Sequence, residues 1–247
     1  MSRYSAFSDD FYVNVNVGTE MDLAGDRTGV LHFFEQIRKR YASMEHFYCR
    51  DRGEYVLEEN KDAGQYRWAS VEPRRVGSGY VNPPTVEEAL EQHRLVLDVA
   101  PYALSLSPID CESVNVMFGF DFTYRGNHNK LVAEALGVAP ALERFTERAG
   151  GTIISHEPAI QLAIDEDCRT QCRLSLETRT SAFQIRTGDY GEDQLSVYLT
   201  MRRYGSLLAG ETYVSVMEEL ARAGLELIDQ HVVDQVLRPL QQTIALK

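Results

Sequence analysis

Two segments of the chain alternate apolar and polar residues with a period of two. In the first segment, Val13, Val15 and Val17 alternate with asparagine and glycine. In the second segment, residues 114–122 place an apolar residue at every second position. This alternation is typical of a β-strand with one face in the core. Each segment runs through a turn into apolar residues at helical spacing, so the pattern predicts strand followed by helix twice.

The two segments also resemble each other in sequence. "VNVNVGTEMDLAG" (13–25) and "VNVMFGFDFTYRG" (114–126) share five of thirteen residues without a gap, where chance would give about one. A second match follows in the same order, "SVEPR" (70–74) with "SLETR" (175–179). Two matched blocks in the same order indicate a tandem duplication.

The remaining segments predict the same element order in both halves. Strands are expected in residues 46–60 and 64–75 of the first half, and in 152–167 and 172–188 of the second. Helices that open on threonine then end each half. We therefore predict an α+β fold built from two β-α-β-β-(β)-α repeats, residues 1–107 and 108–247. The second repeat is expected to have an additional strand, 194–205, and a long C-terminal helix.

This element order is similar to that of the TATA-binding-protein-like and helix-grip architectures. The resemblance concerns order alone, and it implies antiparallel sheets with helices on one face. A saddle that binds nucleic acid needs basic residues and apolar wedges on its open face. Here that face mixes Glu20, Glu72, Asp121 and Glu177 with its arginines, so the resemblance extends to shape and not to function.

Composition narrows the possible partners and the compartment. The chain has 247 residues, 44% of them hydrophobic, and 37 acidic against 25 basic residues give a net charge of −12. Such a charge opposes binding to phosphate backbones and to anionic lipid, so we expect no nucleic acid and no membrane partner. Four sparse cysteines and the absence of a signal-peptide pattern favour a cytoplasmic location.

Strand parity identifies the residues of the open face that could form a site. Glutamate and arginine two positions apart on one strand can orient each other and leave N–H donors for a carboxylate or phosphate. The other interpretation is that these residues form cross-strand ion pairs with no further role. The candidate binding residues are Trp68, Glu72, Arg74, Asp121, Arg173, Glu177, Arg179, Tyr198 and Arg202.

No local motif points to a metal, a cofactor or a catalytic nucleophile. The six histidines include no pair at two-, three- or four-residue spacing, as a local zinc motif would require. Walker, GxGxxG, GxSxG and HExxH patterns are also lacking. Asp26 and Asn127, at the starts of predicted helices, are expected to be N-caps. We therefore expect no cofactor and no metal.

Two classes of function remain. The first is a non-catalytic binding or assembly protein that uses the open sheet faces for a protein partner or a small anionic ligand, with homo-oligomerisation left open. The second is an enzyme for a small anionic metabolite, with Arg74, Arg179 or Arg202 as the anion clamp and Glu72 or Glu177 as general base. An enclosed pocket with a desolvated glutamate would favour the enzyme, and a flat surface of paired glutamates and arginines would favour the binding protein.

Overall fold

The computed structural model describes residues 3–23, 26–50, 53–149 and 151–247. The strands are β1 (Asp10–Thr19), β2 (His46–Arg50), β3 (Glu54–Glu58), β4 (Tyr66–Glu72), β5 (Arg75–Val81), β6 (Cys111–Tyr124), β7 (Ala159–Ala163), β8 (Thr170–Glu177) and β9 (Asp193–Tyr204). The helices are α1 (Arg27–Arg40), α2 (Val86–Ala103), α3 (His128–Leu136), α4 (Pro140–Ala149), α5 (Ala182–Thr187), α6 (Tyr213–Leu227), the π-helical η5 (Ile228–Leu237) and α7 (Arg238–Ala245). None of the described helices is both long and apolar enough to cross a membrane.

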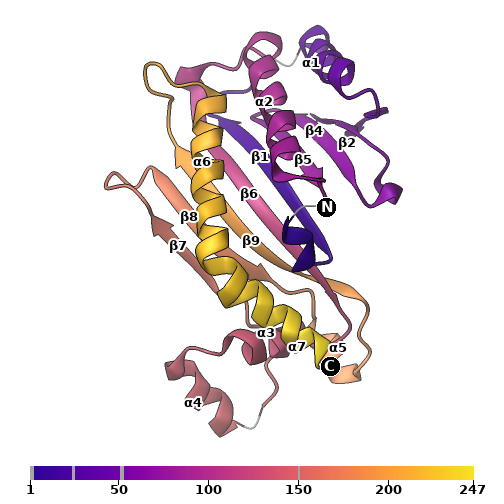
Figure 1. The fold of residues 1–247 in the computed structure, drawn as a ribbon, viewed down its shortest axis with the longest axis vertical. Coiled ribbons are helices and arrows are strands. Elements are labelled where there is room, and N and C mark those ends of the chain that lie inside the picture. The colour runs from indigo at the N-terminus through magenta and orange to yellow at the C-terminus, as the bar shows by residue number, and fades with distance from the viewer. Residues whose placement is uncertain (1–2, 24–25, 51–52, 150) are drawn as a thin grey trace.

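The described strands form one antiparallel sheet in the order β2-β3-β4-β5-β1-β6-β9-β8-β7. The prediction of an α+β fold with antiparallel strands is therefore confirmed. β1 and β6 lie side by side at the centre, and the later strands of each half continue outward from this pair (Figure 1). The β1–β6 pairing joins segments on the two sides of the expected boundary at residues 107 and 108 into one sheet.

Helices cover one face of this sheet (Figure 1). α6 packs on β6 and β9, α2 packs on β5 and β1, and α1 packs against α2. Phe33, Phe34 and Ile37 are buried on one side of α1, and burial of each such side chain contributes roughly 1.5–3 kcal/mol. Asp26 and Asn127 accept hydrogen bonds from the backbone N–H groups of Gly29 and Lys130, which confirms the predicted N-caps.

The strand predicted for residues 194–205 is present as β9, but it does not give the second half more strands than the first. Among the described residues, the first half contributes β1–β5 and the second half contributes β6–β9. The strand that the sequence failed to predict is β5, because its residues 75–81 ("RVGSGYV") contain Gly77 and Gly79 and look like a turn. Glycine is depleted in strands because it lacks a side chain to pack.

The glycines of β5 make room for an aromatic ring on the neighbouring strand. Gly79 is the register partner of Trp68 on β4, and a Cβ atom added to Gly79 would lie 2.2 Å from the Trp68 ring. The same relation recurs at the centre of the sheet, where a Cβ on Gly119 of β6 would lie 2.1 Å from the Tyr12 ring of β1. Large aromatic side chains of the open face thus lie flat over glycines.

This packing predicts that Gly79→Ala destabilises the protein through a steric clash with Trp68. We expect a loss of roughly 1–3 kcal/mol in the free energy of unfolding, measured by urea denaturation. In a Trp68→Ala background the same change should cost less, because the ring is gone and, of the three nearest atoms, only the Asn14 side-chain oxygen remains close to the added Cβ. Gly191→Ala, where no atom is nearer than 3.4 Å to the added Cβ, is the control. Equal costs of Gly79→Ala in both backgrounds would contradict the packing argument.

Candidate functional site

The candidate residues predicted from strand parity lie on the face of the sheet opposite the helices, or just beyond its strands. Core residues such as Val13 and Phe118 are fully buried, and the positions between them point to the open face. β4 supplies Trp68 and Glu72, β6 supplies Asp121, β8 supplies Arg173 and Glu177, β9 supplies Tyr198 and Arg202, and Arg74 and Arg179 follow β4 and β8.

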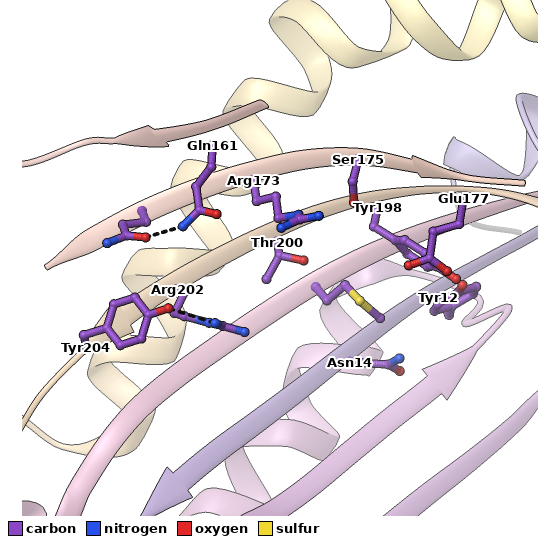
Figure 2. Close-up of a pocket in the computed structure, with 12 residues that line it drawn as sticks. Tyr12, Asn14, Gln161, Arg173, Ser175, Glu177, Tyr198, Thr200, Arg202 and Tyr204 are labelled. Atoms are coloured by element: carbon purple, nitrogen blue, oxygen red, sulfur yellow. Dashed lines mark hydrogen bonds between the residues drawn. The ribbon is translucent and has the colours of Figure 1, made fainter. Parts of the chain in front are cut away.

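The open face is hollowed at three adjoining places. The first hollow, which we call the arginine groove, has a volume of about 610 Å³ (Figure 2). A second hollow of about 600 Å³ shares Arg202 and Tyr204 with it. A third, of about 300 Å³, lies over Trp68 and shares Glu72 and Arg75 with the second. The arginine groove is lined by Tyr12, Asn14, Met117, Gln161, Gln171, Arg173, Ser175, Glu177, Tyr198, Thr200, Arg202 and Tyr204.

Two arginines of this groove have no carboxylate partner. Among the described residues, neither Arg173 nor Arg202 takes part in an ion pair, whereas Arg75 and Arg203 both do. Arg202 is half-buried and oriented by neutral groups. Its Nε donates to the Asn115 side-chain oxygen, and its Nη1 donates to the Tyr204 hydroxyl over 2.9 Å. The groove therefore contains positive charge that the described chain leaves uncompensated.

The glutamates predicted to work with arginines have ion-pair partners. The sequence predicted that Glu72 pairs with Arg74. Glu72 pairs instead with Arg75, which donates from Nη2 to both carboxylate oxygens over 2.6 and 2.8 Å. Arg74 pairs instead with Asp22 over 2.7 Å. The prediction failed because β4 ends at Glu72, so strand parity does not extend to position 74.

The second predicted pair is present but loose. Glu177 and Arg179 approach within 3.4 Å, and their side chains are 50% and 46% exposed. Arg179 also interacts with the Tyr198 hydroxyl. Glu177 therefore lies in water at the rim of the arginine groove and does not have the desolvated environment expected of a general base.

A buried carboxylate lies beside the groove, at Asp121. Its residue is 8% exposed, and Tyr12 Oη donates to its Oδ1 over 3.2 Å. Burial raises the pKa of Asp121, and the like charge of Asp10, its register partner on β1, raises it further. The hydrogen bond from Tyr12 and the positive charge of Arg179 oppose the rise. The pKa of Tyr12 is itself raised by burial and by the Asp121 charge, so the hydroxyl keeps its proton.

Parity reasoning missed several residues of the groove. Tyr12 lies one step before the predicted strand, and Tyr204 lies at the end of β9, so both follow by extending the same alternation. Gln161 and Gln171 depend on the pairing of β7 with β8, which the sequence alone does not specify. In the described part of the chain, no group of three or more His, Cys, Asp or Glu side chains could hold a metal ion.

The comparisons with known proteins identify no family. No family model matches the chain, and no curated protein matches it. Among solved structures, one similar chain is an alkyldihydroxyacetonephosphate synthase, with 10% sequence identity and a TM-score of 0.17, over 95% of this chain and 42% of the synthase. At that TM-score the likeness carries no argument.

The exposed Glu177–Arg179 pair should contribute little to stability. We expect Glu177→Gln to change the free energy of unfolding by less than about 0.5 kcal/mol, because solvent screens exposed pairs. Glu59→Gln is the comparison variant for a buried glutamate. Glu59 forms an ion pair with Arg67 and accepts a hydrogen bond from Ser43. This variant should cost about 1–3 kcal/mol in the same urea titration. Equal losses in the two variants would show that the Glu177–Arg179 pair supports the fold.

Asp121→Asn should make stability less sensitive to pH. The pKa of Asp121 is raised on folding, so the native state holds its proton more tightly than the unfolded chain. This stabilisation is complete below the ordinary value of 3.8 and is lost as pH rises through the folded-state pKa.

The stability of the Asp121→Asn variant relative to the original protein should therefore increase as pH rises from about 4 to 7. Urea denaturation across that range measures the difference. Asp189→Asn, at an exposed carboxylate beyond α5, is the control for the removal of one negative charge. A pH-independent difference for Asp121→Asn would contradict the raised pKa.

Proposed function

We propose that this chain is a non-catalytic binding protein, and that the open face of its sheet receives the ligand or partner. The observation that carries the proposal is the pair of uncompensated guanidinium groups in the arginine groove. In a chain of net charge −12, carboxylates are abundant. Other described arginines also lack an ion pair, but Arg173 and Arg202 both line one hollow, and this proximity supports a place for an external anion.

The shape of the face supports binding more than catalysis. The hollows are open to solvent along one side, and adjoining hollows share lining residues. The volume of the arginine groove lies in the range of small-molecule sites, roughly 300–1,000 Å³. The glutamates named as possible bases are ion-paired. An enzyme was expected to have an enclosed pocket with a desolvated glutamate. Open hollows and ion-paired glutamates therefore favour the binding protein.

The strand order supports the proposed duplication and the TATA-binding-protein-like element order. β1 and β6, in which the first matched block begins, are neighbours at the centre of the sheet. β4 and β8, in which the second block begins, each lie two strands out from their central strand. A duplication with a pseudo-two-fold axis between β1 and β6 would produce this arrangement. We propose that the repeat built a wide open face, and not a nucleic-acid saddle, because the chain is strongly acidic.

One observation favours the alternative of an enzyme for a small anionic metabolite. Asp121 has the buried environment and the raised pKa that the sequence-based proposal sought at Glu72 or Glu177. Its bond from Tyr12 would hold a proton beside a ligand in the arginine groove. In this alternative, Asp121 takes the role of general acid or base, and Arg202 that of the anion clamp.

We also propose a cytoplasmic location. The structure describes all four cysteines as free, and Cys49 and Cys168 are exposed. Free exposed thiols persist in a reducing compartment. If the protein is expressed in an oxidising compartment, mass analysis of its thiols should show oxidised cysteines.

The binding proposal is tested by a thermal-shift panel of small carboxylates, phosphates and sulfates. We expect at least one compound to raise the melting temperature, because a ligand that binds only the folded state stabilises it. Thr200→Trp, which fills the groove floor, should abolish that shift. Glu219→Trp, on an exposed site of α6, should leave it unchanged. A shift that survives Thr200→Trp, or a panel with no active compound, contradicts the proposal.

A further inference from the structure

We infer that Arg173 and Arg202 form a clamp for a dianionic phosphomonoester group, the phosphate of a small organic ligand. This inference rests on the proposed binding function and names the ligand class for the arginine groove. It concerns the end of the groove between β8 and β9, away from Asp121 and Tyr12.

The strand register brings the two arginines to one place. Arg173 is the register partner of Thr200, and Arg202 is the partner of Gln171, so the arginines occupy diagonal positions on neighbouring strands. Cβ atoms at such positions lie about 7–8 Å apart, which the length of an arginine side chain easily spans. Figure 2 shows both guanidinium groups in the groove, with Thr200 between them in this view.

The charge of the two arginines sets the charge of the ligand. Like charges this close on neighbouring strands repel each other, and no described carboxylate neutralises them. A single carboxylate supplies one negative charge and two oxygens, which one guanidinium can satisfy. A phosphomonoester carries a charge of about −1.5 to −2 at pH 7 and three acceptor oxygens, so it matches two guanidinium forks.

The fixed orientation of Arg202 strengthens the clamp. Its bonds to Asn115 and Tyr204 hold the planar group in place without neutralising it, so less side-chain freedom is lost on binding. The Thr200 hydroxyl adds a donor on the groove floor. Beyond the arginines, the groove continues to Met117 and Tyr198, where the organic part of the ligand would lie.

The decisive experiment compares phenyl phosphate with phenyl sulfate, which has nearly the same shape and a single charge. Isothermal titration calorimetry at pH 7.5 should give at least about tenfold tighter binding of the phosphate, the scale of one charge-assisted contact. At pH 5 phenyl phosphate is mostly a monoanion, because its second pKa is about 6, and the advantage should largely vanish.

Variants then assign the binding to the two arginines. Arg173→Gln and Arg202→Gln should each weaken phenyl phosphate binding by at least about tenfold. Arg202→Lys, which keeps the charge and removes the fork, should give an intermediate loss. Arg222→Gln removes one charge from an exposed site on α6 and should leave the affinity unchanged. Melting temperatures of the variants confirm that each is folded.

The possible outcomes separate this inference from the proposed function. Equal affinity for phenyl phosphate and phenyl sulfate, or an affinity unaffected by both glutamine variants, overturns the clamp. If the clamp fails but another anion binds and Thr200→Trp abolishes its binding, the proposed binding function still stands. Tighter binding of a phosphotyrosine peptide than of phenyl phosphate would support the clamp. It would also indicate that the phosphate belongs to a protein partner.

Discussion

The antiparallel pairing of β1 with β6 is the contact on which the rest of the structure depends. Its register runs from Asp10 opposite Asp121 to Gly18 opposite Ser113, and it places the core residues of both strands on the same side. A shift by one residue would turn every side chain of one half to the wrong face. The pairing therefore makes two segments into one sheet, with one helix-covered face and one open polar face.

This constraint explains why local sequence patterns predicted much of the fold. Alternation around Val13 and Val114 gave the central strands, and the helical spacing around Phe33 gave α1. β5 was missed because Gly77 and Gly79 have no side chain to enter the pattern. These glycines make room for the Trp68 ring, which lies across them. This role follows from the pairing of β4 with β5 and is not apparent in the local sequence.

The candidate site was predictable as a face and not as a set of contacts. Parity placed Arg173, Tyr198 and Arg202 correctly on the open face, because a strand fixes the direction of each side chain. Whether an arginine has a carboxylate partner depends on the neighbouring strand and on where a strand ends. Arg75 pairs with Glu72 across a turn, whereas Arg202 has Asn115 beside it, and no local pattern distinguishes these cases.

The acidic character of the chain and the two uncompensated arginines are connected by electrostatics. A net charge of −12 opposes the approach of anions to the chain as a whole, and screening in physiological salt limits this repulsion to about 8 Å. A local positive site can therefore attract an anion at short range while the remaining surface discourages extended polyanions such as nucleic acid. Selectivity for a small anion over a polyanion would follow from this contrast, because a small anion needs to contact only the groove, whereas a polyanion must also approach the rest of a chain of net charge −12.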